Sequence, residues 1–128
     1  MASIFGFRSR NPDRDRQTDL QRFDRLAKLF DQIAAEIEAE KIGLENRYRS
    51  TATNAAFLVE AMENGSASTS KLSNVGAMTN AILNCERRIA ELARQNGVMK
   101  ELRHSLDAIV EDDADRFGSQ AGRTSSVG

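Results

Sequence analysis

Apolar residues recur along residues 20–62 at spacings that alternate between three and four. Eleven of the thirteen positions hold an apolar residue or tyrosine, against about five expected by chance at a hydrophobic content of 40%. This 3.5-residue period predicts a helix that keeps one stripe, here called the first seam, against a partner helix. The first seam consists of Leu20, Phe23, Ala27, Phe30, Ala34, Ile37, Lys41, Leu44, Tyr48, Thr51, Ala55, Leu58 and Met62.

A second seam follows over residues 75–113, and ten of its twelve positions are apolar. The apolar residues place two spacings of three in succession at 96, 99 and 102, which predicts a stammer, a local change of supercoil geometry, beside Gly97. The second seam consists of Val75, Met78, Ile82, Cys85, Ile89, Leu92, Asn96, Met99, Leu102, Leu106, Ile109 and Asp113.

Start and stop signals divide the chain around the two seams. Asn11 is a good N-cap with Pro12 at the first helical position, and Thr18 with Gln21 offers a second start. Asn64-Gly65 is a typical helix stop, and the connection that follows is short and polar. We expect a flexible tail over 1–11, a helix over 12–64, a turn over 65–70, a helix over 71–116 and a disordered tail over 117–128.

These elements predict an all-α fold, a long antiparallel helical hairpin that forms a coiled coil. Two long helices joined by so few residues must run antiparallel, so that paired residues have numbers adding up to roughly 135. Residues 8–28 carry an excess of basic side chains and residues 105–116 an excess of acidic ones. Antiparallel packing brings these segments together, and their opposite charges favour that closure.

Composition narrows the possible functions. The 18 basic and 19 acidic residues give a net charge of −1, so neither nucleic acid nor an anionic membrane is an expected partner. The longest apolar run, 55–59, is far shorter than the roughly 20 residues that span a membrane. Cys85 is the only cysteine, which excludes an intramolecular disulfide and favours a cytoplasmic protein.

Apolar residues also lie off the seams, and a single hairpin cannot cover them. In a bundle the apolar stripe of each helix is wider than a coiled-coil seam, so this surplus predicts that two hairpins dimerise into a four-helix bundle or that a hairpin docks on another protein. The tail adds the apolar residues Ile4 and Phe5 before Gly6 and Phe7 after it. The tail can dock in a partner, touch a membrane surface or stay disordered. The expected partner-binding residues are Ile4, Phe5, Phe7, Leu26, Ile33, Phe57 and Val59.

A polar layer interrupts both seams near their middle, at Lys41 and Asn96. A polar residue at a core position can fix the register of two helices, and the nearby Gly43 and Gly97 allow a hinge. The simpler alternative is that the Lys41 ammonium reaches outward along its stem and has no such role.

Catalytic and metal-binding patterns are weak. Glu101 and His104 match the Glu-x-x-His element of di-iron bundles, but their phase directs them to solvent. Cys85 lies on the seam, where it acts as a small buried apolar residue. The acidic cluster of Glu36, Glu38 and Glu40 is typical of a solvated helix face. We therefore expect no enzyme activity, no metal and no cofactor.

The sequence thus indicates a noncatalytic coiled-coil adaptor or structural subunit that acts through self-association and protein contacts. The alternative is a small helical chaperone or export-associated protein that sequesters an amphipathic helix of a client. An adaptor is a stable helical dimer on its own, whereas a chaperone is stabilised by its client.

Overall fold

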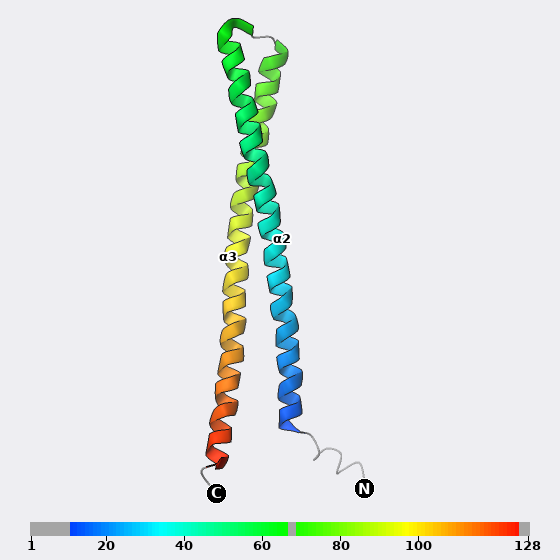
Figure 1. The fold of residues 1–128 in the computed structure, drawn as a ribbon, viewed down its shortest axis with the longest axis vertical. Helices are drawn as coiled ribbons and strands as arrows, with labels where there is room; N and C mark the ends of the chain where they lie inside the picture. The colour runs from blue at the N-terminus through cyan, green and yellow to red at the C-terminus, as the bar shows by residue number, and fades with distance from the viewer. Residues whose placement is uncertain (1–10, 67–68, 126–128) are drawn as a thin grey trace, which may run out of the picture. The chain divides into compact units, whose positions relative to one another are not determined.

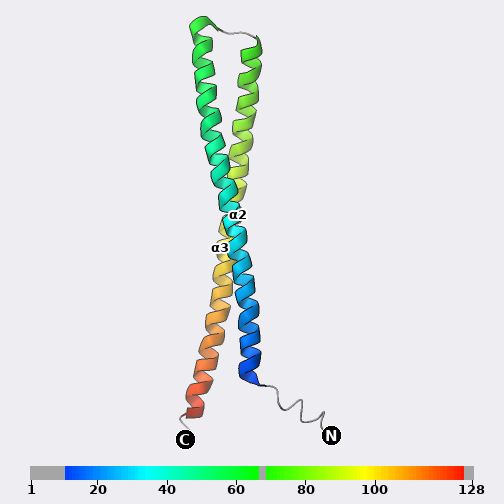
Figure 2. The same cartoon turned by 45° about the vertical axis from the view of Figure 1, so that its right-hand side comes forward.

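The computed structural model describes residues 11–66 and 69–125, and within them it contains two long helices and no strand. Helix α2 spans Pro12–Ala61 and helix α3 spans Thr69–Ser125. They are joined through the wide turn η1 (Met62–Ser66) and pack against each other as an antiparallel hairpin (Figure 1; Figure 2). The prediction of an all-α hairpin is therefore confirmed.

Asn11 caps the start of α2. Its side-chain Oδ1 accepts a hydrogen bond of 3.0 Å from the backbone N–H of Asp13, and its carbonyl accepts one of 3.1 Å from Asp15. Pro12 occupies the first helical position, where it needs no hydrogen-bond partner for its nitrogen. The alternative start at Thr18 is not used, because the Thr18 hydroxyl donates to the Arg14 carbonyl at 3.0 Å, inside the helix.

The chain reverses at Gly65, whose φ of 85° is the one positive value among the described residues. Residues with a Cβ rarely adopt this conformation, which explains the stop signal at Asn64-Gly65. The α-helical part of α2 ends at Ala61, three residues earlier than the sequence indicates, because η1 already widens into the turn.

Helix α3 is longer than the sequence indicates. It begins at Thr69 rather than at 71 and runs to Ser125 rather than to 116, so that residues 117–125, expected as part of a disordered tail, are helical. No proline stops the chain in this stretch, and an ion pair of 3.1 Å between Arg116 and Asp112 supports the turn before it. Gly118 alone does not end a helix, since it costs only about 1 kcal/mol relative to alanine.

The helix pair divides into two compact units. The terminal unit comprises Met1–Ile33 and Met99–Gly128, and the turn unit comprises Ala34–Val98. Each unit contains one part of α2 and one part of α3. Both helices are continuous where the sequence allowed a hinge, at Gly43 and Gly97.

The core of the turn unit consists of seam residues. Ile37, Cys85 and Leu92 are buried there, and Leu92 has no exposed surface at all. Burial of Cys85 agrees with its prediction as a small apolar core residue. The core is narrow because only one stripe of each helix faces the other, as in a two-stranded coiled coil.

In the terminal unit the core contains Ala27 and Leu106, and here the predicted second seam is wrong. Leu102 and Ile109, assigned to the seam, are 45% and 55% exposed. Arg103 and Val110 take their places as half-buried residues. The spacing of three and four therefore continues without a break, and the predicted stammer does not occur.

Side-chain bonds across the pair fix its register. The Tyr48 hydroxyl donates to Glu86 at 3.2 Å in the turn unit, where Asn96 also donates to Glu38. In the terminal unit Arg103 pairs with Asp31. The two numbers in each pair add up to the same value, one less than the rough sum predicted for an antiparallel hairpin, so the predicted alignment is confirmed.

Candidate interaction surface

The two sides of the seam differ in the terminal unit. In heptad terms the seam residues occupy positions a and d, position e lies on one side of the seam, and position g lies on the other. In an antiparallel pair the e positions of both helices share one side and the g positions share the opposite side. We call the e side of the terminal unit the charged flank and the g side, with the adjoining c positions, the apolar flank.

The charged flank consists of Asp24, Asp31 and Asp107 together with the head group of Arg103. The Arg103 Nε lies 3.2 Å from Asp31 Oδ1 across the pair, and its Nη1 lies 3.1 Å from Asp107 Oδ1 in the same helix. One guanidinium thus joins carboxylates of α2 and α3. The stem of Arg103 fills a seam position while its charge reaches the rim, which explains how a basic residue can belong to this core.

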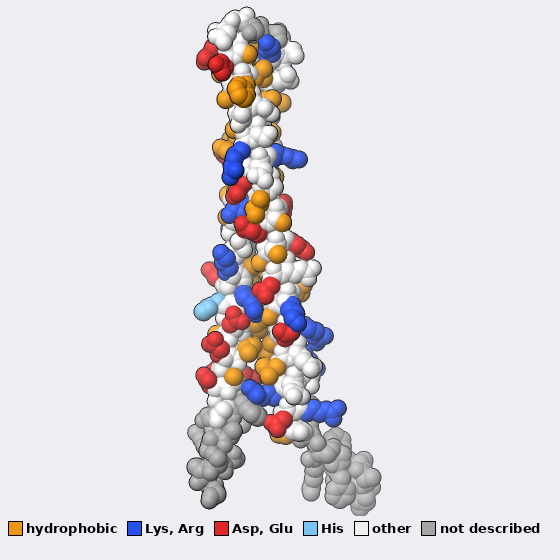
Figure 3. Space-filling model, viewed as in Figure 1, with side chains coloured by type: hydrophobic (Ala, Val, Ile, Leu, Met, Phe, Trp, Pro, Cys, Tyr) orange, Lys and Arg blue, Asp and Glu red, His pale blue; other side chains and the backbone are white. Residues whose placement is uncertain are grey.

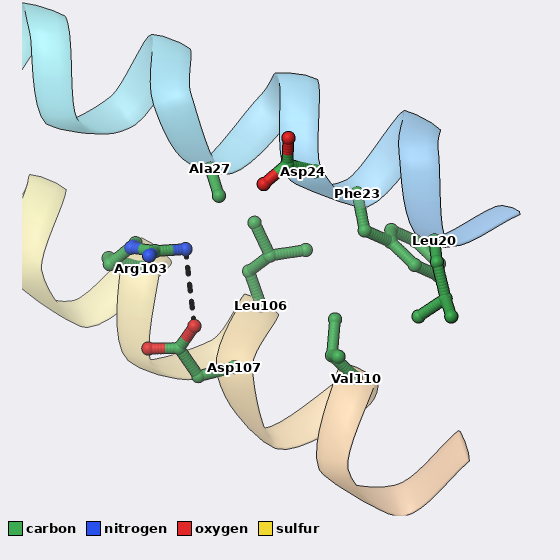
Figure 4. Close-up of a pocket in the computed structure, with 8 residues that line it drawn as sticks. All are labelled: Leu20, Phe23, Asp24, Ala27, Arg103, Leu106, Asp107 and Val110. Atoms are coloured by element: carbon green, nitrogen blue, oxygen red, sulfur yellow. Dashed lines mark ion pairs between the residues drawn. The ribbon is translucent and has the colours of Figure 1, made fainter. Parts of the chain in front are cut away.

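An open groove of about 390 Å³ lies on the charged flank. In Figure 4 Ala27 of α2 and Leu106 of α3 point toward each other across it, with the Arg103–Asp107 ion pair at one side. Figure 3 shows hydrophobic side chains between the two helices of this unit and charged side chains on either side. The floor is formed by Leu20, Phe23, Ala27, Leu106 and Val110. The groove can therefore hold an apolar side chain, with charges only at its rim.

The apolar flank consists of Leu26, Leu29, Ile33, Leu102 and Ile109. Four of them are strongly exposed: Leu26 to 41%, Leu29 to 49%, Leu102 to 45% and Ile109 to 55%. On α2 the spacing is three and then four, which places these side chains on one helix face. On α3 Leu102 and Ile109 are seven residues apart, with Ser105 between them on the same face. Each helix of the terminal unit therefore carries a second apolar stripe beside the seam.

In the turn unit the g side of the seam carries charged side chains that bond to each other across the helix pair. Arg88 makes two bonds to the Glu40 carboxylate, of 3.0 and 3.2 Å, and a third of 3.2 Å to Glu91. These hydrogen bonds and the negative charges of both carboxylates raise the pKa of Arg88. Glu38 and Glu40 are exposed, as predicted for a solvated face. In addition, Glu40 pairs with Arg88 and Glu38 accepts a hydrogen bond from Asn96, both across the helix pair.

Lys41 and Asn96, the predicted register residues, each bond to a different glutamate. Lys41 is 27% exposed, and its Nζ lies 3.9 Å from Glu45 Oε1 in its own helix. The Asn96 amide donates to Glu38 Oε2 through a long hydrogen bond of 3.4 Å. Lys41 thus directs its charge outward along its stem, whereas Asn96 joins the two helices.

Tyr48 also joins the two helices of the turn unit. Its hydroxyl donates to Glu86 Oε1 at 3.2 Å, and this hydrogen bond, with the negative charge of Glu86, raises the pKa of Tyr48. Because the folded-state pKa lies above the unfolded value of about 10, this contact stabilises the fold below pH 10 and is lost as the pH rises through the folded-state pKa.

Titration of the phenol tests this contact without a probe, since the chain has one tyrosine and no tryptophan. We expect the phenolate absorbance to appear above the ordinary tyrosine range, and Glu86→Gln to shift the titration toward pH 10 because the repelling charge is gone. Glu91→Gln is the control, since Glu91 bonds to Arg88 instead. Identical titrations of the Glu86→Gln variant and the wild type would contradict the contact.

The predicted partner-binding residues fall in three places. Leu26 and Ile33 belong to the apolar flank. Phe57 and Val59, exposed to 66% and 41%, lie in the turn unit on different faces of α2. The tail positions Ile4, Phe5 and Phe7 lie outside the described residues.

Three residues of the apolar flank are not among the predicted partner-binding residues. They are Leu29, which lies outside the predicted seam, and Leu102 and Ile109, which the apolar pattern places in the seam. The available signal was Val110 together with the unbroken spacing from Met99 to Leu106, since that phase moves Leu102 and Ile109 to the outside.

The residues considered for chemistry are separated. Cys85 is buried, whereas His104 is exposed on α3. Over residues 11–66 and 69–125 no three histidine, cysteine or acidic side chains come together as metal ligands do. In the same ranges, neither helix has the length of apolar sequence that crossing a membrane requires.

Comparison with known proteins finds no match to a protein family, to a curated protein or to a solved structure.

Proposed function

We propose that this protein is a noncatalytic coiled-coil adaptor or structural subunit that acts through self-association and protein contacts. The observation that supports the proposal is the large amount of apolar surface outside the seam. Burying such surface is the main favourable term in most protein association. Within the part of the chain that the structure describes, the exposed large apolar residues are Leu26, Leu29, Ile42, Phe57, Val59, Leu72, Leu83, Val98, Leu102 and Ile109.

In this proposal two hairpins form a homodimeric four-helix bundle. Bundle helices bury a wider stripe than a two-stranded coiled coil, and the terminal unit has such a stripe on both helices. The unpaired, buried Cys85 suits a reducing compartment, so the proposed location is the cytoplasm.

The mass in solution tests this function. We expect size exclusion with light scattering, over about 1–200 μM, to show a mass that approaches twice the 14.2 kDa of one chain. Circular dichroism should show high helicity without any added partner. A mass of one chain throughout the series would contradict self-association.

A second candidate function is a chaperone that holds an apolar segment of a client. The groove over Phe23 and Leu106 favours it, because its floor is apolar and its rim is charged. A chaperone would be a monomer that gains thermal stability when an amphipathic helical peptide is added, whereas the adaptor would be a dimer that does not.

A further inference from the structure

We propose that a second copy of this chain packs on the apolar flank of the terminal unit, helix pair against helix pair. The inference rests on the proposed self-association and adds the location of the contact between the two copies. It excludes the charged flank, where the ion pairs of Arg103 with Asp31 and Asp107 and of Lys28 with Asp24 would have to be desolvated.

The apolar residues of both helices lie on the same side of the seam in the terminal unit. Leu26 directly precedes the seam residue Ala27, and Leu102 directly precedes the seam residue Arg103. Both therefore lie on the side of the seam opposite Asp31 and Asp107, which follow the seam residues Phe30 and Leu106. Stripes on α2 and α3 thus adjoin and form one surface across the helix pair.

The rim of this surface favours a copy of the same chain over a partner of opposite charge. On α2 the stripe ends at Arg22 and Asp19, which form an ion pair of 3.5 Å. On α3 it ends at Asp112 and Arg116, paired at 3.1 Å. Because the helices are antiparallel, both ion pairs lie at the end of the helix pair away from η1, where two acids and two bases come together, and a two-fold axis parallel to the helices can place acids of one copy beside bases of the other.

The size of the surface fits a reversible dimer. Counted with its rim, from residue 19 to 33 on α2, it is about 21 Å long and about 20 Å wide across two helices, so each copy would bury on the order of 400 Å² and the dimer about 800 Å². That total is typical of a weak, transient interface. We therefore expect a dissociation constant on the order of tens of micromolar, with the exposed leucines at the centre.

Lysine substitutions on this surface test the inference. Leu29→Lys and Leu102→Lys place a charge at the centre of the contact, and we expect each to raise the dissociation constant at least about tenfold. Both residues are about half exposed, so helicity by circular dichroism should not change. Phe57→Lys is the matched control: Phe57 lies four heptads from Leu29 on the same helix and is 66% exposed, but it belongs to the turn unit.

Opposite charges should restore the contact. A Leu29→Lys, Leu102→Lys double variant and a Leu29→Glu, Leu102→Glu double variant should each be monomeric, and their mixture should form a heterodimer. A merely destabilised fold would not give this rescue. If the wild type is a monomer, both the proposed function and this inference fail. If the wild type is a dimer that the lysine variants leave intact, or that Phe57→Lys weakens equally, only this inference fails.

Discussion

Leu92→Ala is expected to lower the free energy of unfolding by about 2–5 kcal/mol, because it removes three carbon atoms from a side chain with no exposed surface. Leu92 lies on the seam of the turn unit, between the two helices. Domains of this size have a total stability of about 5–15 kcal/mol, so this one substitution removes a large share of it.

The register explains why Leu92 is so well covered. The bonds of Tyr48 with Glu86 and of Asn96 with Glu38 place Lys41 in the same layer as Leu92. Since the Lys41 charge is directed toward Glu45, we expect only the apolar stem of Lys41 in this layer. A polar residue in the seam is therefore compatible with the most buried position of the chain.

Urea unfolding followed by circular dichroism measures this effect, and Leu83→Ala is its control. Leu83 lies in the same helix and the same unit and undergoes the same substitution, but it is 55% exposed. We expect a change within about 1 kcal/mol there. Equal losses at the two positions would show that the packing described for the turn unit is wrong.

Much of this fold could be predicted from the sequence because coiled-coil geometry is periodic. The first seam, from Leu20 to Met62, has no exposed residue, including the polar Lys41 and Thr51. The antiparallel alignment followed from a short turn and two long helices. Gly65 marked the reversal, because few residues other than glycine adopt a φ of 85°.

The second seam could be predicted only as far as Met99. Beyond it, apolar character favoured Leu102 and Ile109, whereas the unbroken spacing favoured Arg103 and Val110. The spacing prevails because a continuous helix keeps its phase, and a stammer would require the backbone to overwind. Arginine can occupy the seam because its long stem is apolar and its charge reaches Asp31 and Asp107.

The candidate surface was harder to predict than the fold because it depends on that phase. With Leu102 and Ile109 in the seam, α3 had no apolar stripe to match Leu26 and Ile33. The ion pair of Arg88 with Glu40 was missed for another reason. The two residues are 48 positions apart, and only the register, which sequence fixes to within a turn, brings them together.

The phase itself gives the second large prediction, at Leu106 in the terminal unit. Leu106 is 5% exposed and points at Ala27, so Leu106→Ala should cost about 2–4 kcal/mol of unfolding free energy. Leu102→Ala, four residues earlier in the same helix, should change it by no more than about 1 kcal/mol, because Leu102 is 45% exposed. A stammered seam would instead make the two losses alike.

Both variants are compared in urea at a protein concentration below the dissociation constant of the dimer, so that association does not add to the stability of the fold. At higher protein concentration the effects of the two substitutions should differ in kind as well as in size. Leu106→Ala destabilises the hairpin at every concentration. Leu102→Ala should remove the gain in melting temperature that the wild type shows on concentration, because Leu102 belongs to the apolar flank. One pair of alanines therefore distinguishes the residue that holds the helices together from the residue that we propose holds two copies together.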